Sequence, residues 1–279
     1  MKRKFLKLLV VIGFCVTMAL GTTACNGKNK IDEAVEAIES VFIMQDVKVT
    51  GLNHGKITGL NQEGKQLSEL RVPAKIGKIT ITDIESGAFK DCTNLTSVIL
   101  SDGLRHIHSW AFKNCTNLTN ITIPDSVIDI SDYAFQGCGN LTNVYITDME
   151  AWCKLWFGKN DANPLCYADN LYLNNELVTE LIIPNTITEI KDYTFYSCGS
   201  LQSVVIHKGV TSIGEYAFRS CHGLTRVYYK GTERDWTKIS IDSSNVSLIG
   251  AMKYYYSETQ PTTDGNYWHY VDGVPTKWE

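Results

Sequence analysis

Residues 107–124 read IHSWAFKNCTNLTNITIP, and this stretch recurs along the chain with its key residues in a fixed register. In each copy a phenylalanine is followed three residues later by a cysteine and six residues later by a leucine. The phenylalanines are Phe89, Phe112, Phe135, Phe195 and Phe218, the cysteines are Cys92, Cys115, Cys138, Cys198 and Cys221, and the leucines are Leu95, Leu118, Leu141, Leu201 and Leu224. The first three copies follow one another at intervals of 23 residues, and the last two are also 23 residues apart. Such a fixed period predicts a solenoid whose coils bury their apolar faces only by stacking.

One unit shows how each coil is built. In the segment 118–123 the apolar Leu118, Ile121 and Ile123 point inward, while Asn120 and Thr122 point outward by strand alternation. Pro124 follows directly and ends the strand. The spacing therefore predicts one short strand per coil, with successive strands parallel and about 4.8 Å apart.

These repeats resemble the BspA-like leucine-rich-repeat family of bacterial surface proteins, whose repeat of about 23 residues carries the same Ala-Phe, Cys and Leu pattern. The resemblance covers roughly residues 67 to 256. It implies a mainly β leucine-rich-repeat solenoid with short helices and a parallel sheet on its concave side. It also implies a surface or secreted protein with a role in adhesion, and it brings no catalytic residues. We expect the solenoid to span residues 47–256.

Two longer units, at about residues 144–173 and 227–256, interrupt the regular repeat, and each contains a tryptophan. Asp148 and Thr232 precede short amphipathic stretches in these units and are suitable N-cap residues. We therefore expect longer coils with a short helix on the convex side. Asn174-Asn175 predicts a tight turn after the first of them.

The N-terminus, residues 1–24, has the parts of a secretory signal. Basic residues are followed by an apolar run from 8 to 20 and then by small residues up to Ala24. Cys25 directly afterwards resembles the lipidated cysteine of bacterial lipoproteins, although Thr22 stands where Leu or Val is usual. This predicts an exported protein that is anchored by lipid on Cys25 to the outer side of a bacterial membrane; simple cleavage near Ala24 is the alternative. Residues 25–46 would be a tether with a short helix.

The charge of the mature chain bears on its partners. Without the four basic residues of the signal, 22 basic and 30 acidic residues remain, a net charge of −8. Nucleic-acid binding depends on clustered Lys and Arg, so this balance argues against a nucleic-acid partner. An extracellular or host protein is the expected partner, and a glycan is the alternative.

Residues 257–279 are expected to be a loop and a hairpin that cap the solenoid. The Asp272-Gly273 pair between two apolar segments is a hairpin signal, and an uncapped terminal coil would expose a sheet edge. The aromatic residues here are Tyr267, Trp268, Tyr270 and Trp278. They are interpreted as the buried face of this cap; stacking on sugars is the alternative.

No catalytic, nucleotide-binding or metal-binding motif is present, so no enzyme activity, cofactor or metal is expected. His106 and His108 would share one face of a strand, but two histidines alone make a weak metal site. The repeated cysteines are expected to be buried and unreactive. Cys153 and Cys166 lie in the same long coil, and whether they form a disulfide is left open.

A binding surface is expected on the concave side. The outward positions in the middle of successive strands are Arg71, Ile99, Thr122, Tyr145, Ile182, Val205, Tyr228 and Tyr255. This row is apolar and aromatic, as interface cores often are, although strands favour such residues in any case. Flanking positions would form a polar rim: Glu69, Asn120, Asn143, Glu180, Ser203 and Arg226.

The sequence thus favours an adhesin-like surface lipoprotein that binds a protein partner on its concave face. A structural or self-associating envelope protein and a glycan-binding surface lipoprotein are the alternatives.

Overall fold

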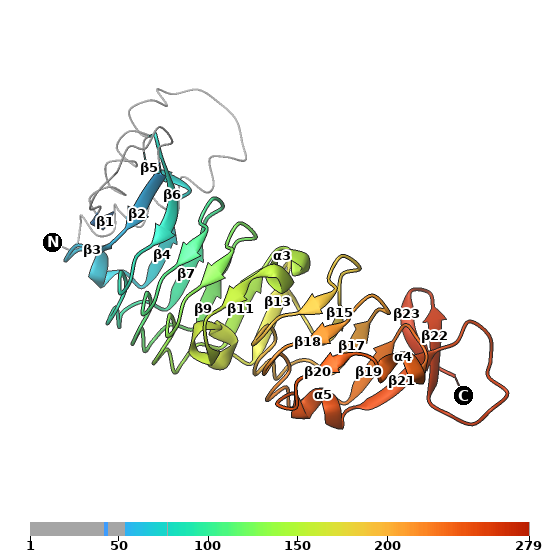
Figure 1. The fold of residues 1–279 in the computed structure, drawn as a ribbon. Coiled ribbons are helices and arrows are strands. Elements are labelled where there is room, and N and C mark those ends of the chain that lie inside the picture. Colours follow the sequence, from blue (N-terminus) through green and yellow to red (C-terminus); the bar gives the residue numbers. More distant parts are fainter. Residues whose placement is uncertain (1–41, 44–53, 77, 279) are drawn as a thin grey trace, which may run out of the picture.

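A computed structural model of the chain describes residues 42–43, 54–76 and 78–278. The expected signal peptide, Cys25 and the short N-terminal helix lie outside the described residues. Figure 1 shows a row of coils that advances from β2 near one end of the described chain to β23 near the other. At the N-terminal end β1 (Phe42–Ile43) pairs antiparallel with β3 (Gly59–Leu60).

One strand of each coil contributes to one wall of the solenoid, whose outward side we call the concave face. In the N-terminal half these strands pair in the order β4, β7, β9, β11 and β13, all parallel, and β14 then pairs antiparallel with β13. Their bounds are β4 (Glu69–Val72), β7 (Ser97–Leu100), β9 (Asn120–Thr122), β11 (Asn143–Ile146), β13 (Asn170–Leu173) and β14 (Glu176–Leu177). The parallel sheet predicted from the repeat is thereby confirmed.

A second sheet continues this wall in the C-terminal half. Strands β15, β17, β19, β21 and β22 are parallel neighbours, and β23 closes the sheet antiparallel to β22. Their bounds are β15 (Glu180–Ile182), β17 (Ser203–Ile206), β19 (Arg226–Tyr229), β21 (Met252–Tyr256), β22 (Tyr267–Val271) and β23 (Val274–Lys277). Because β14 occupies the edge of the first sheet, the two sheets are not hydrogen-bonded to each other along this wall.

The opposite wall is divided in the same way. One sheet runs in the order β12, β10, β8, β6 and β2, with β5 beside β6, and the other in the order β16, β18 and β20. The bounds are β2 (His54–Ile57), β5 (Lys75–Ile76), β6 (Ile79–Ile84), β8 (His106–Ile107), β10 (Asp129–Ile130), β12 (Trp156–Phe157), β16 (Glu189–Ile190), β18 (Ser212–Ile213) and β20 (Ser240–Ile241). We call the break between β14 and β15, and between β12 and β16, the seam.

The repeated Phe and Cys residues build the core between the walls. The rings of Phe112 and Phe135 stack with their centroids 5.2 Å apart, and neither ring is exposed. The thiol of Cys138 donates to the carbonyl oxygen of Phe112 in the preceding coil over 3.1 Å, and Cys115 and Cys221 make the equivalent bond. The cysteine is therefore a small buried residue whose weak S–H donor satisfies a backbone carbonyl inside the core.

The two longer coils carry the predicted short helices. Helix α3 (Met149–Lys154) starts at Asp148, whose carboxylate accepts from two backbone N–H groups, and α4 (Glu233–Trp236) starts at Thr232. The remaining helical turns of the described residues are η1 (Gly64–Gln66), η2 (Asn160–Ala162), η3 (Pro164–Cys166) and α5 (Val246–Gly250). Both N-caps proposed from the sequence are confirmed.

Two buried asparagines replace backbone hydrogen bonds where the long coils depart from the repeat. In the regular coils the N–H of the repeated phenylalanine donates to the next coil's carbonyl, as Phe112 does to Ala134 over 2.8 Å. Beside the second long coil the N–H of Phe218 donates instead to Oδ1 of Asn245, also over 2.8 Å. In the first long coil Asn163 supplies a donor in place of a backbone N–H, because its side-chain amide donates to the carbonyl oxygens of Tyr193 and Thr194 in the next coil. Each asparagine is fully buried and bonded, as a polar group inside a core must be.

Candidate binding face

The row of outward positions on the concave face has the register expected from the repeat. Arg71 pairs with Ile99, Ile99 with Thr122, and Thr122 with Tyr145 in the N-terminal sheet. Across the seam Ile182 pairs with Val205. Arg71 is exposed, Ile182 is 51% exposed, and the middle three residues are half-buried. These five predicted residues therefore lie on the surface of one face.

Tyr172 extends this row, and the sequence analysis missed it. It pairs with Tyr145 across β11 and β13, and the two rings stack with centroids 4.8 Å apart and planes 21° apart. Both rings are half-buried, so each keeps part of its surface open to solvent. The alignment of the long coil with the regular unit would have identified Tyr172, because Leu171-Tyr172-Leu173 has the same alternation as the strand before it.

Beside the tyrosines runs a ladder of asparagine side chains. The amide of Asn143 donates to Oδ1 of Asn120 over 2.8 Å, and Asn170 donates to Oδ1 of Asn143 over 3.1 Å. Each amide is held by its neighbours and keeps further donor and acceptor capacity at the surface. Asn120 and Asn143 were expected in the polar rim, and the ladder adds Asn170 to it.

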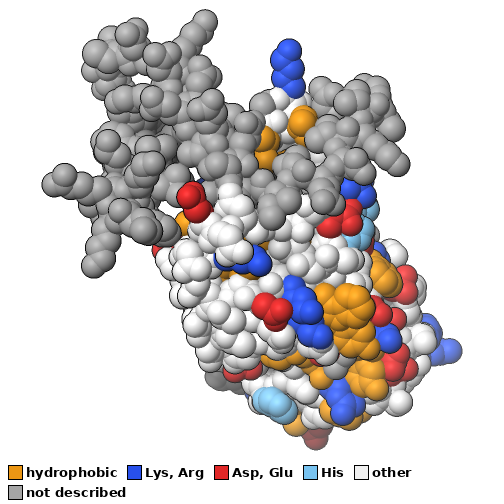
Figure 2. All heavy atoms as spheres, turned by 90° about the vertical axis from the view of Figure 1, so that its left-hand side faces the viewer, with side chains coloured by type: hydrophobic (Ala, Val, Ile, Leu, Met, Phe, Trp, Pro, Cys, Tyr) orange, Lys and Arg blue, Asp and Glu red, His pale blue; other side chains and the backbone are white. Residues whose placement is uncertain are grey.

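Charged groups at this face are sparse and mixed. Arg71 lies at the N-terminal end of the row, and Glu69 and Glu180 are exposed at its border. Figure 2 views the N-terminal end of the solenoid rather than this face, and on that end Lys and Arg are interspersed with Asp and Glu around apolar side chains, without a large area of one sign. The described surface on that side offers no basic track of the kind a nucleic acid requires.

From β17 to β21 the same face is covered by the protein itself, which corrects part of the expectation. Val205 is only 2% exposed and Tyr228 only 5%, because both pack in a second apolar cluster with Tyr254 and Trp268. Trp268 of the hairpin is fully buried, and its indole N–H donates to the carbonyl of Tyr229 over 2.9 Å. The placement of Val205 and Tyr228 as solvent-facing residues is therefore wrong.

Tyr255 was also placed on the wrong side of its strand. Tyr228 pairs with Tyr254, whose ring stacks on it at 5.5 Å, while Tyr255 pairs with Tyr229 and packs against the main core. The reason is coil length. Tyr145 and its partner Tyr172 are 27 residues apart, but Tyr228 and Tyr254 are only 26 apart. A shift of one residue turns every side chain of a strand to the other face.

The hairpin of β22 and β23 is a cap, as the sequence analysis favoured. Trp268 lies against Tyr256 and Tyr270 with ring centroids 5.2 and 4.9 Å away, and Lys277 lies over the ring of Tyr254. A buried and edge-on cluster of this kind leaves no flat row of rings for sugars at Trp268. Ser203, which was expected to be a solvent-facing residue of the polar rim, is also buried.

The two histidines considered as a metal pair bond to aspartates of neighbouring coils instead. His106 Nδ1 bonds Asp129, and His108 Nε2 bonds Asp83 at 3.2 Å. Burial alone would raise the pKa of Asp83, but its hydrogen bonds with Thr82 and His108 outweigh it and hold that pKa below the ordinary value. No group of three or more His, Cys, Asp or Glu side chains suited to a metal occurs among the described residues.

The seven cysteines in the described part of the chain carry free thiols, including Cys153 and Cys166. Burial raises the pKa of each of these two to about 12, and acidic neighbours add to the effect. Since the thiolate is the reactive form, these thiols are poor nucleophiles near neutral pH.

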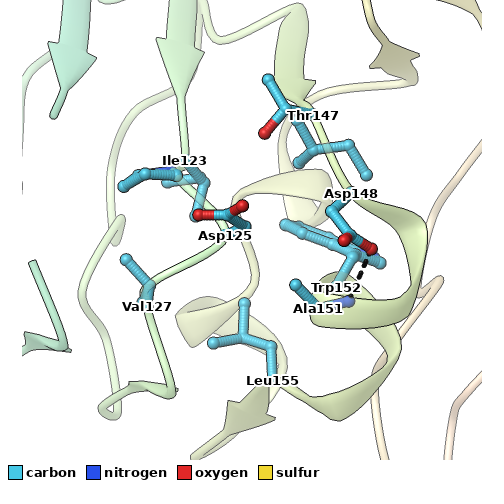
Figure 3. A pocket seen from close by; sticks show the side chains of 10 residues that line it. Ile123, Asp125, Val127, Thr147, Asp148, Ala151, Trp152 and Leu155 are labelled. Carbon is cyan, nitrogen blue, oxygen red and sulfur yellow. Dashed lines mark hydrogen bonds between the residues drawn. The ribbon is translucent and has the colours of Figure 1, made fainter. Parts of the chain in front are cut away.

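A small cavity lies where α3 leaves its coil. Figure 3 shows that Asp125, Thr147 and Asp148 surround it together with Trp152 and Leu155, and the dashed line marks the N-cap bond from Ala151 to Asp148. Its volume of about 10 Å³ accommodates at most one water molecule. It is a packing defect at the helix start and too small for a ligand.

Comparison with known proteins agrees with this architecture. The family model described as "BspA type Leucine rich repeat region" matches six copies over residues 64–155 and 168–257, well over half of the chain. The chain belongs to this family. No curated protein sequence matches the chain significantly. In the part of the chain that the structure describes, no helix is long and apolar enough to cross a membrane.

Several solved structures of bacterial leucine-rich-repeat proteins are similar. One is the Treponema pallidum leucine-rich-repeat protein, 22% identical, which covers 68% of this chain and 83% of its own length with a TM-score of 0.43. A Bacteroides ovatus leucine-rich-repeat protein is also 22% identical over 67% of this chain and 69% of its own, with a TM-score of 0.32. A Bacteroides capillosus protein is 20% identical over 48% and 94%, with a TM-score of 0.39. Proteins with these repeats are in general binding proteins rather than enzymes.

Proposed function

We propose that this BspA-type protein is an exported, lipid-anchored surface protein of adhesin type that binds a protein partner on the N-terminal half of its concave face. The observation that carries the proposal is the stacked pair Tyr145 and Tyr172, which stays partly open on a face that the protein's own hairpin covers at Val205 and Tyr228. We call this pair, with the asparagine ladder of residues 120, 143 and 170, the tyrosine patch.

The chemistry of the tyrosine patch suits a protein interface. Tyrosine brings a large contact area and a polar tip at small conformational cost, and it is enriched among residues that dominate binding energy. The asparagine amides are held in place by one another, so they can pair with backbone groups of a partner without first being ordered. The N-terminal anchor on Cys25 would hold the solenoid outside the membrane, where such a partner is accessible.

Binding is tested with the purified protein on an array of extracellular matrix proteins and mucins. We expect saturable binding to a protein, weakened at least tenfold in the double variant Tyr145→Ala/Tyr172→Ala, since truncated interface anchors commonly cost more than about 1.4 kcal/mol. Trp156→Ala is the matched control, because Trp156 is an aromatic residue that is 51% exposed in β12 on the opposite wall, and this variant should bind normally. Binding that both variants retain would refute the site. Absence of any binding by folded protein would favour the structural or self-associating role.

The anchor is tested separately. We expect the wild-type protein to partition into the detergent phase after extraction from its bacterium, and Cys25→Ala to partition into the aqueous phase. A wild-type protein found only in the aqueous phase would contradict lipidation without affecting the assignment of the binding face.

A further inference from the structure

A second set of aromatic side chains lies at the turns between the two walls, in an unusual backbone conformation. Each regular turn has two residues with positive φ, one two positions before the repeated phenylalanine and one two positions after it. The first position holds Gly87, Trp110, Tyr133, Tyr193 and Tyr216, and the second holds Asp91, Asn114, Gly137, Ser197 and Ser220. The second set is small or polar, as left-handed positions favour, whereas the first is mostly large and aromatic.

The backbone itself does not require these rings. Gly87 forms the same turn with φ of 68° and no side chain, while Tyr193 and Tyr216 adopt φ of 60° and 57° despite the steric cost to a large residue. The reason for the rings therefore lies in what their side chains do. Strain of this kind is concentrated at sites of function, and here the strain and the aromatic groups coincide.

In the C-terminal half these rings line a hollow. Tyr193, Tyr196, Tyr216 and Arg219 surround a volume of about 300 Å³ that is open to solvent. The rings of Tyr193 and Tyr216 are stacked with centroids 5.3 Å apart, and Tyr196 is nearly perpendicular to Tyr216. The volume is at the lower end of the roughly 300–1,000 Å³ of small-ligand sites.

The charges around the hollow define its ligand. Arg219 lies over the ring of Tyr216 at 5.1 Å and forms no ion pair with any described residue. Burial raises the pKa of Tyr193, and the nearby carboxylates of Glu215 and Asp192 add to this. The hollow thus has an aromatic surface beside a cationic donor, Arg219, and the acidic side chains Glu215 and Asp192 lie near Tyr193.

We propose that this hollow binds a neutral carbohydrate chain, specifically β-linked pyranoses of gluco configuration. Such rings carry their hydroxyls equatorially, so a flat C–H face can pack on the ring of Tyr196, which stands apart from the stacked pair Tyr193 and Tyr216, while the hydroxyls donate to carboxylates and accept from the guanidinium of Arg219. A cationic ligand is disfavoured by Arg219, and a polyanion is disfavoured by Glu215 and Asp192. Because the turns are stacked at about the strand spacing of 4.8 Å, successive coils present contacts at intervals comparable to one sugar unit.

The site is independent of the concave-face proposal, since its residues lie in the turns and not on the strands of that face. The N-terminal half has an aromatic pair at the same turn position: the rings of Trp110 and Tyr133 are parallel within 9°, and Lys159 lies over Tyr133. That pair serves as an internal control.

The test is isothermal titration calorimetry of the purified protein with cellohexaose and chitohexaose, and polygalacturonate as the anionic comparison. We expect one or both neutral hexasaccharides to bind, and Tyr196→Ala to weaken binding at least tenfold. Tyr216→Gly should weaken it similarly while the melting temperature stays equal or rises, because glycine relieves the left-handed strain. Tyr145→Ala and Trp110→Gly should bind as the wild type does.

Three results would overturn the proposal. The first is no binding of either neutral hexasaccharide by folded protein. The second is binding of polygalacturonate alone, which would assign the hollow to an anion at Arg219. The third is a Tyr216→Gly variant that melts at a lower temperature and, together with Tyr196→Ala, binds normally, which would make the rings a packing feature of the turn.

Discussion

Replacement of Trp268 by alanine is expected to detach the C-terminal hairpin while the solenoid stays folded. The indole is fully buried, its N–H bonds the carbonyl of Tyr229, and its ring contacts Tyr228, Tyr256 and Tyr270 at centroid distances of 4.9 to 5.4 Å. Truncation of a buried tryptophan costs about 3–5 kcal/mol. A loss of about 4 kcal/mol lowers the docking equilibrium of the hairpin roughly a thousandfold.

The loss should be local because each coil of a solenoid contacts only its neighbours. Hydrogen exchange measures this directly: amides of β22 and β23 should exchange up to about a thousandfold faster, while those of β4, β7 and β9 keep their protection. Trp268→Phe keeps a ring but loses the donor, and it should cost about 1 kcal/mol. Val274→Ala, at an exposed hairpin position, is the control. Unchanged exchange in the hairpin, or equal acceleration in all strands, would refute the assignment of Trp268 as a local lock.

Three further predictions each concern one side chain. Asn245→Ala leaves buried backbone groups unpaired and should lower the free energy of unfolding in urea by about 2–3 kcal/mol, against under about 1 kcal/mol for the exposed Asn94→Ala. The thiol of Cys166 should react with a disulfide reagent at pH 8 only after unfolding, because burial raises its pKa to about 12; fast reaction of the native protein would contradict this. The pKa of Asp83 is lower in the folded protein than the value of about 4 in the unfolded chain, so the ionised carboxylate stabilises the fold above that pH. Acidification below pH 4 should therefore lower the melting temperature, and it should lower that of Asp83→Asn less. Identical pH profiles of the two proteins would exclude a stabilising role for the bond between Asp83 and His108.

Much of the fold could be predicted from the sequence because each coil of a solenoid repeats the same local structure. The 23-residue register placed Ile99, Thr122 and Tyr145 on one face, strand alternation added Arg71, and the structure pairs the four residues in chain order. The N-caps were also readable, because an Asp or Thr before an amphipathic stretch has a defined bonding role.

The errors arose where contacts depend on tertiary geometry. Tyr255 was misplaced because the second long coil is one residue shorter than the first, and three consecutive tyrosines contain no alternation to fix the register. The burial of Val205 and Tyr228 depends on the hairpin placing Trp268 over that face, which no repeat pattern encodes. The left-handed aromatic turns were missed because bulky rings are not the residues from which positive φ is predicted.

The seam has a consequence for how the protein responds to a pulling force. Both walls lose their strand pairing there, so the two blocks are joined by the continuous apolar core and a few bonds such as that from the indole of Trp152 to the carbonyl of Thr194. Within a block, tension along the axis must break a ladder of backbone bonds at every coil. Stretched between a membrane and a partner, the molecule should therefore yield first at the seam and extend in two steps, as two stiff segments connected by a breakable joint.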